Sequence, residues 1–204
     1  MNADTPDRQS PSTGHRESRP AVFPIRRLQA NDAEPLAAFY NALSTASKRT
    51  FHPLGEQTTL LECRKSVEDN RLGIERKLDL VAAQGQEIIG WGFLRDLDKT
   101  ETNLGLAIAD KYHGQHLGTR LMAALLDEAR ARSVTVIKLT VVRDNKVAQG
   151  LYEKFGFEKT GEFDSTEDGL SYWRMVAQIS DTSQAMERDP VPCEVGEQAI
   201  GTSP

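Results

Sequence analysis

The sequence predicts an α/β (α+β) protein with one mixed, mostly antiparallel central sheet and helices on both of its faces. Strand-like runs follow one another in meander order in the first half of the chain, joined by short turns. The second half alternates strand, helix, strand and helix, and it ends in two more strand-like runs. A length of 204 residues suits one domain with a full hydrophobic core.

The first half supplies two helices and four strands. An opening strand is expected over residues 22–28, and the pair Asn31–Asp32 offers an N-cap for a helix over 33–43. A polar loop over 47–56 then leads to a second helix over 58–70. Two alternating or apolar runs, 77–83 and 87–95, are joined by a turn containing Gly85, which predicts a hairpin. A further antiparallel strand is expected over 102–108.

The second half contains the most informative stretch, residues 104–157. After the strand comes a turn with two glycines, Gly114 and Gly118, and then an amphipathic helix over 117–132. A strand over 136–142 leads into a short helix that carries Tyr152 and ends at Gly156. The runs 160–163 and 170–176 are expected to close the sheet as a hairpin around residues 164–169.

The two ends of the chain differ from its centre. Residues 1–21 and 179–204 are rich in proline and polar residues and are expected to be disordered, because they have too little apolar surface to offset the entropy of ordering. The C-terminal segment is acidic, with a net charge of −4 out of −5 for the whole chain. Residues 22–178 are therefore expected to form the single folded domain.

Charge and composition exclude several classes of function. A nearly neutral core gives no basic face for nucleic acid, and no apolar run is long enough to span a membrane. Cys63 and Cys193 are too few for a disulfide framework. His113 and His116 are three residues apart, but no other ligand completes a metal site at a recognised spacing, so no metal is expected. The cytoplasm is the expected location.

The turn before the helix at 117 is a candidate anion site. The first N–H groups of a helix have no acceptor within the helix, and they point outward together with the positive end of the helix dipole. Gly114 and Gly118 would let a ligand approach the backbone closely, because neither residue has a Cβ atom. Taken alone, the turn is better explained as a plain strand-to-helix connection with glycine for sharpness.

With the residues that follow, the stretch resembles the Gcn5-related N-acetyltransferase (GNAT) superfamily. The family signature is Arg or Gln, two free positions, Gly, one free position, and then Gly or Ala. In this chain His113 replaces the Arg or Gln, His116 replaces the first Gly, and Gly118 fills the last position. Asn145 and Tyr152 then follow at the usual spacing. The resemblance extends over about residues 23–177. It implies the acyl-CoA N-acyltransferase fold and direct acetyl transfer from acetyl-CoA to a primary amine.

The resemblance also implies which residues form the site. Backbone groups of the strand before the turn would bind the pantetheine arm and the thioester oxygen, the turn would bind the pyrophosphate, and Asn145 would bind the CoA arm. The implied donor-binding residues are Leu106, Ala107, Ile108, His113, Gly114, Gln115, His116, Leu117, Gly118, Thr119 and Asn145. Tyr152 would be the general acid that protonates the leaving thiolate.

The general base is less well specified. Some relatives have Glu near the end of the strand before Asn145, but here Thr140 occupies that position and cannot act as a base. Glu101, just before the central strand, is the best remaining carboxylate. His52 and Asp164 are weaker candidates, and a chain of water molecules would need no side chain at all.

The acceptor is expected to contact the first helices, the loop 47–56 and the hairpin 164–169. The predicted partner is a small-molecule or peptide amine, with neither nucleic acid nor membrane as partner, and a homodimer stays open. Two other functions compete with catalysis. One is a non-catalytic module of the same fold that binds and senses acyl-CoA, and the other is a scaffold that uses its terminal segments for protein contacts.

Overall fold

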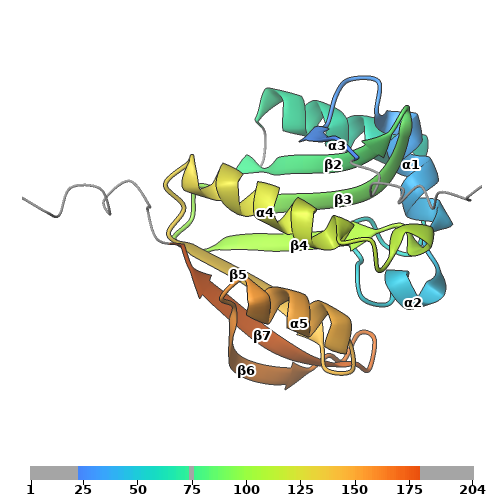
Figure 1. Cartoon of the computed structure of the whole chain (residues 1–204). Coiled ribbons are helices and arrows are strands. Elements are labelled where there is room, and N and C mark those ends of the chain that lie inside the picture. Colours follow the sequence, from blue (N-terminus) through green and yellow to red (C-terminus); the bar gives the residue numbers. More distant parts are fainter. Residues whose placement is uncertain (1–22, 74–75, 180–204) are drawn as a thin grey trace, which may run out of the picture.

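The computed structural model describes residues 23–73 and 76–179. Its sheet has seven strands in the order β1-β2-β3-β4-β5-β7-β6, with helices on both faces (Figure 1). Every neighbouring pair is antiparallel except β4 and β5, which are parallel. The predicted mixed sheet is thus confirmed. The predicted terminal segments lie outside the described residues, except that Ile179 is buried and donates its N–H to the carbonyl of Thr135.

Most predicted elements are present with small shifts at their ends. The strands are β1 (Ile25–Arg27), β2 (Leu78–Gln84), β3 (Glu87–Arg95), β4 (Thr102–Ile108), β5 (Val136–Val142), β6 (Glu158–Asp164) and β7 (Ser171–Gln178). The helices are α1 (Ala33–Ala42), α2 (Thr45–Lys48), α3 (Leu60–Leu72), the 3-10 helix η2 (Asp110–Tyr112), α4 (Leu117–Arg130) and α5 (Lys146–Lys154). Strands β3, β4 and β5 have the predicted bounds.

Two local predictions differ from the structure. Part of the predicted polar loop forms α2, which has only four residues and is too short to show helical periodicity. Asp32 is the N-cap residue of α1, but its carboxylate does not cap the helix. That carboxylate instead accepts hydrogen bonds from the Arg26 guanidinium at 2.5 and 2.9 Å and from the Gln29 N–H at 2.7 Å.

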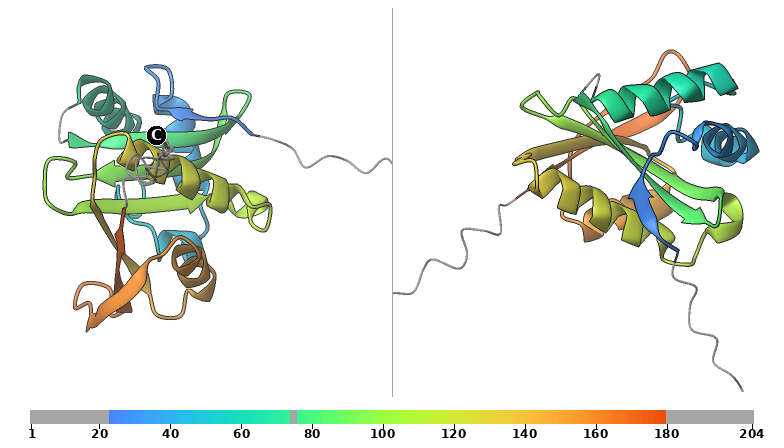
Figure 2. Two further views of the ribbon diagram at one scale, coloured as in Figure 1. Left: turned by 60° about the vertical axis from the view of Figure 1, so that its left-hand side comes forward. Right: turned by 90° about the horizontal axis from the view of Figure 1, so that it is seen from above.

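The sheet separates two hydrophobic clusters. One cluster packs α4 and α5 against the sheet and includes Leu121, Leu125 and Tyr152. The other packs α1 and α3 against the opposite face and includes Leu36 and Trp91. Figure 2 shows α1 and α3 on one side of the sheet and α4 and α5 on the other. Both layers therefore hold the central strands in place.

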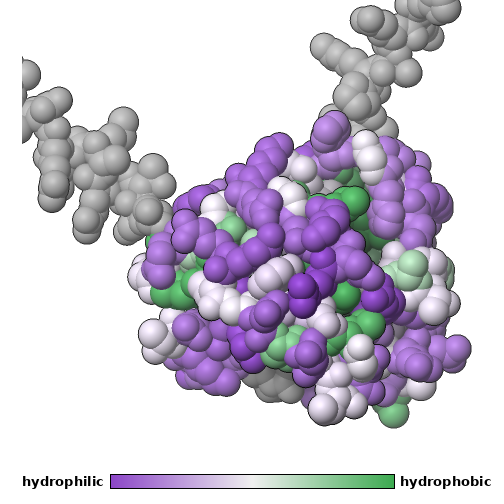
Figure 3. Space-filling model, turned by 90° about the horizontal axis from the view of Figure 1, so that it is seen from below, coloured by the Kyte–Doolittle hydropathy of each residue, from purple (hydrophilic) through white to green (hydrophobic). Residues whose placement is uncertain are grey.

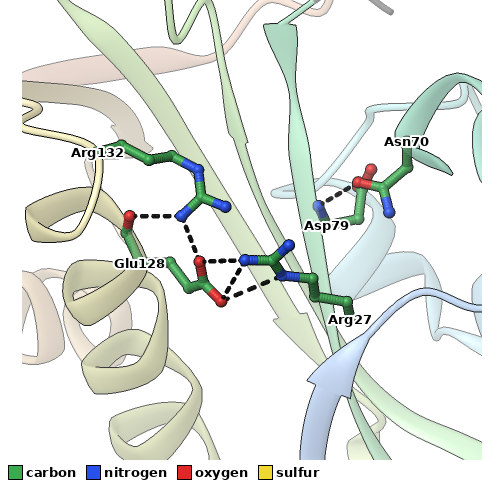
Figure 4. A network of polar contacts seen from close by, with 5 residues as sticks. All are labelled: Arg27, Asn70, Asp79, Glu128 and Arg132. Carbon is green, nitrogen blue, oxygen red and sulfur yellow. Dashed lines mark hydrogen bonds and ion pairs between the residues drawn. The ribbon is translucent and has the colours of Figure 1, made fainter. Parts of the chain in front are cut away.

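Polar contacts tie a helix on each face to the β1–β2 edge of the sheet (Figure 4). Glu128 of α4 accepts hydrogen bonds from Arg27 of β1, the shortest of them at 2.9 Å, and also pairs with Arg132 just beyond the end of the helix. On the opposite face, the Asn70 side chain of α3 accepts the Asp79 N–H of β2 at 2.8 Å. These contacts hold α4 and α3 against the β1–β2 edge of the sheet, on the far side of β3 and β4 from β5.

The surface carries few exposed large apolar side chains. Among the described residues they are Leu61, Leu72 and Val147. The face seen from below is mainly hydrophilic and is interrupted by small hydrophobic patches (Figure 3). None of the described helices has both the length and the apolar character needed to cross a bilayer.

Candidate active site

The parallel strands β4 and β5 diverge and leave a gap in the sheet. They pair only where Thr102 and Asn103 face Ile137 and Lys138. Beyond these pairs the two strands separate toward their carboxyl ends, as Figure 1 shows. Because backbone N–H and C=O groups need partners, the unpaired edge of β4 is available to bind a ligand.

The register of β3 and β4 identifies which groups face this gap. Ala109 donates its N–H to the Ile89 carbonyl at 2.9 Å, and the pairing continues without a shift from Ile108 back to Asn103. Antiparallel strands alternate between residues that bond the partner and residues that bond away from it. The backbone groups of Ala107 therefore face β3, whereas those of Leu106 and Ile108 face the gap. This refines the predicted backbone site at 106–108.

The His113 ring forms a hydrogen bond with one of these backbone groups. Its Nε2 lies 2.9 Å from the carbonyl oxygen of Ile108. A carbonyl only accepts hydrogen bonds, so Nε2 carries the proton in this contact. The N–H of Ile108 and both backbone groups of Leu106 remain directed at the gap. His113 thus secures the turn to the end of β4.

The turn 113–119 opens the N-terminus of α4. Gly114 and His116 both have positive φ, +75° and +58°, and His116 caps the helix without a side-chain hydrogen bond. The first N–H bonded back into the helix is that of Arg120, which donates to the His116 carbonyl at 3.1 Å. The N–H groups of the first three helical residues, 117–119, precede it and have no acceptor within the helix. They are the N–H groups to which the sequence analysis assigns anion binding, and this role stays a prediction.

The second turn of α5 lies near this turn. A Cβ atom on Gly118 would lie 3.6 Å from Leu151 and 3.8 Å from Ile108, so the first turn of α4, α5 and the end of β4 meet at one point. Asn145 caps α5, because its Oδ1 accepts the Ala148 N–H at 3.1 Å. Among the described residues its Nδ2 group has no acceptor and is available to a ligand.

Gln149 is a buried contributor to this region that sequence reasoning missed. Its Nε2 donates to the carbonyls of Val142 at 3.3 Å and Arg143 at 2.9 Å. These bonds satisfy the end of β5 where it turns into α5. The only sequence signal is its position four residues after Asn145, which places both residues on one helix face.

Tyr152 is buried in the same hydrophobic cluster as Ile108. Its ring lies 5.8 Å from that of Phe157. The hydroxyl makes no hydrogen bond with any described residue, and burial raises the pKa of Tyr152 to about 12. The phenol therefore stays protonated at ordinary pH, as a proton donor must, but it is a weaker acid than a free tyrosine.

Glu101 lies away from these residues. It precedes β4 at the end where β4 and β5 are still paired, and its carboxylate binds the Lys138 ammonium at 2.8 Å. Five residues separate it from Leu106, or roughly 17 Å along a strand. The structure therefore does not bring Glu101 together with Tyr152 and the open part of the gap, because Glu101 stands at the paired end of β4 and the gap opens at the other end.

Asp110 anchors α2 to the end of β4. Its carboxylate accepts the Ser44 N–H at 3.0 Å, the Ser44 hydroxyl at 2.7 Å and the Ser47 hydroxyl at 2.7 Å. Partial burial disfavours the charged form, but the hydrogen bonds from the two serines outweigh it and lower the pKa of Asp110 to about 2. The anchor is therefore ionised throughout the physiological range.

Comparison with known proteins identifies the family. Residues 36–157, more than half of the chain, match the acetyltransferase (GNAT) family. The chain belongs to this family, whose enzymes use acetyl-CoA as the acyl donor, which confirms the resemblance predicted from the sequence.

Individual relatives agree with this assignment. The ribosomal protein bS18-alanine N-acetyltransferase of Haemophilus ducreyi is 28% identical over 82 residues, which are 40% of this chain and 57% of that protein. The chain thus matches only about half the length of this curated relative. A GNAT-family acetyltransferase from Streptococcus pneumoniae has a TM-score of 0.66 at 24% identity, covering 78% of this chain and all of that one. The structure of yncA from Salmonella typhimurium, solved with acetyl-CoA, has a TM-score of 0.66 at 18% identity, covering 79% and 96%.

Proposed function

We propose that this chain is an acetyl-CoA-dependent N-acetyltransferase that transfers the acetyl group directly to a primary amine of a small molecule or a protein. The observation that carries the proposal is the convergence at the β4–β5 gap. Unpaired backbone groups of β4 face the gap, and the open N-terminus of α4 meets the end of β4 and α5, the helix that begins after Asn145 and carries Tyr152. The activity of the curated relatives supports transfer to a protein amine and a cytoplasmic location.

The residues fit a CoA ester, which would supply the activated acetyl group. In the proposal the N–H groups of residues 117–119 bind the pyrophosphate, with the rest of the turn 113–119 shaping that site. The backbone of Leu106 and Ile108 binds the pantetheine arm and the thioester oxygen, while Ala107 contributes packing. Asn145 donates its Nδ2 protons to the CoA arm. Hydrogen bonds to charged phosphate oxygens each contribute roughly 1.5–3 kcal/mol.

Tyr152 is the proposed proton donor to the leaving sulfur. A phenol with a pKa of about 12 is more than three units weaker as an acid than a free thiol of pKa ~8.5, so complete transfer to a solvated thiolate is unfavourable. The dry surroundings that raise the pKa of Tyr152 also raise that of a buried thiol. Tyr152 therefore donates a hydrogen bond as charge develops on sulfur and releases its proton late.

The proposal assigns no carboxylate as general base. An amine must lose its proton before it attacks, and Thr140, on β5 beside the gap, cannot accept one. Water molecules take this proton in the proposed reaction. Thr140 and the histidine at position 116 also support the competing function, an acyl-CoA sensor without turnover. Thiol release from acetyl-CoA across a panel of amines, including peptides with free N-termini, separates the two functions.

Two glycine-to-alanine substitutions, one at the site and one as its control, test the donor site without disrupting the fold. Gly118→Ala places a methyl group in ordinary contact with Leu151 and Ile108. It should stabilise α4 by ~0.5–1 kcal/mol while raising the CoA dissociation constant about 10-fold, because it narrows the space beside the anion site. Gly150→Ala in α5 has open space around it and is the matched control, with the same stabilisation and unchanged CoA affinity. Equal CoA affinity in both variants would refute the assignment of the turn.

A further inference from the structure

Helix α2 crosses the open end of the β4–β5 gap. Its N-cap, Ser44, is bound by Asp110 immediately after β4, and its C-cap, Arg49, is bound by Asp144 immediately after β5. Both strands diverge toward these ends, so one short helix joins the two sides of the gap. In Figure 1 α2 lies beside the carboxyl ends of both strands. An acceptor that enters from this end must pass α2.

The two attachments of α2 differ in strength. On the β4 side, Asp110 accepts three hydrogen bonds from Ser44 and Ser47. On the β5 side, the Arg49 guanidinium binds the Asp144 carboxylate as a fork, with N–O distances of 2.9 and 3.1 Å. The side chains of this pair are 41% and 64% exposed, and such ion pairs are weak because water competes for both partners. Both attachments lie at the surface, but the β5 side has two hydrogen bonds against three and is the easier one to release.

The hairpin between β6 and β7 reaches the same place. The hydrogen bonds with Asp144 raise the pKa of Arg49, and the electrostatic influence of Asp168 and Tyr172 acts in the same direction at longer range. Tyr172 donates a hydrogen bond from its hydroxyl to Asp168 at 2.5 Å, which braces the hairpin internally. The loop 47–56 thus contacts the loop after β5 through Arg49, and the hairpin is close enough to influence Arg49 electrostatically.

We propose that the Arg49–Asp144 pair is a releasable clasp that determines which acceptors enter the gap. With the clasp closed, α2 and the β5–α5 loop are joined and only the amine of a slender small molecule reaches the donor. With the clasp released, the entrance also admits an amine carried on a polypeptide. This inference rests on the proposed acetyltransferase function, and Arg49 and Asp144 are positioning residues in it.

Acceptor selectivity tests the clasp directly. Arg49→Gln and Asp144→Asn each remove the charge of one partner and nearly retain its shape. We expect each variant to raise the ratio of kcat/KM for a peptide N-terminus to kcat/KM for a small primary amine by about 10-fold, a typical size for discrimination by pocket shape. CoA affinity should not change. The double replacement Arg49→Asp with Asp144→Arg restores an ion pair of reversed sign and should return the ratio to the wild-type value.

A second exposed ion pair supplies the matched control. Arg71 binds Glu68 at 2.6 Å on the surface of α3, remote from the gap, and both side chains are about half exposed. Arg71→Gln should leave the ratio of peptide to small-amine transfer unchanged. The same ratio in Arg49→Gln, Asp144→Asn and the wild type would overturn the clasp, and so would a charge-swapped variant that behaves like the single variants.

Amide hydrogen exchange tests the clasp independently of catalytic activity. Amides of residues 45–50 should exchange faster in either single clasp variant and return to the wild-type rate in the charge-swapped protein, because the clasp holds α2 on the β5 side. Unchanged exchange would overturn the clasp even in an inactive protein. Failure of the proposed function has a different signature, namely that the wild-type chain binds CoA and releases no thiol with any amine.

Discussion

Tyr152→Phe separates the catalytic role proposed for the phenol from its packing role. The variant keeps the ring against Phe157 and removes only the hydroxyl, which makes no hydrogen bond with any described residue. Losing a general acid lowers turnover by ~10²-fold or more, equivalent to about 2.7 kcal/mol of activation free energy. Losing a hydroxyl without a partner should change the free energy of unfolding by less than ~1 kcal/mol, in the stabilising direction.

The assay measures kcat by thiol release, CoA affinity by calorimetry and stability by denaturant unfolding. Tyr40→Phe is the control with the opposite pattern, because the Tyr40 hydroxyl donates to the Gly55 carbonyl in the core. That variant should lose about 1 kcal/mol of stability and keep its kcat. Wild-type turnover in Tyr152→Phe would assign Tyr152 to the core alone.

The pH dependence of the wild type gives a second check on Tyr152. A phenol with a pKa of about 12 stays neutral up to roughly pH 11, so its ionisation should not lower kcat between pH 7 and 10. A decline of kcat with an apparent pKa near 10 that disappears in Tyr152→Phe would contradict the buried environment seen in the structure.

Two further variants test the frame around the gap. The pKa of Asp110 is lowered to about 2, so its bonds to Ser44 stabilise the fold above pH ~4, and this stabilisation is lost as the pH falls through 2. After allowance for solvent screening, Asp110→Asn should lower the free energy of unfolding by about 1 kcal/mol at pH 7 and by almost nothing near pH 2. A difference from the wild type that stays constant in acid unfolding would contradict this. Gly105→Ala would place Cβ 2.5 Å from the Phe93 ring and should lower the unfolding free energy by ~1–3 kcal/mol, whereas Gly161→Ala, which meets only the end of a flexible side chain, should not. Equal melting temperatures for the two variants would contradict the packing seen at Phe93.

The sequence predicted the fold well where periodicity is strong. Strands β3, β4 and β5 have the predicted bounds, because each is a run of apolar or alternating residues between clear turn signals. Helix α4 was predictable from its apolar stripe, and its final turn alone was placed two residues too far. Helix α2 was not predictable, since its order depends on bonds to Asp110 and Asp144, which lie more than 60 residues away in the chain.

The positions of the candidate site residues were predictable only where a local pattern defines them. The turn 113–119 and Asn145 were expected at the starts of two helices, and α4 and α5 begin there in the structure. That these groups bind CoA stays a prediction. Glu101 was chosen for its nearness to β4 in the sequence, but it lies at the paired end of that strand, opposite the end that diverges from β5. The register of β3 and β4 likewise decides which backbone groups face the gap, namely those of Leu106 and Ile108 and not those of Ala107.

The backbone conformation of His116 explains why its departure from the family signature is compatible with the proposed anion site. The residue has φ +58°, a left-handed conformation that glycine adopts freely and that histidine adopts more often than most other residues. A Cβ atom makes this conformation less favourable by roughly 1–2 kcal/mol, so the surrounding turn must hold it in place. That conformation ends the turn and directs the N–H groups of residues 117–119 outward. The proposed anion site thus depends on backbone geometry, and we expect a side chain at position 116 to affect the stability of the turn more than anion binding.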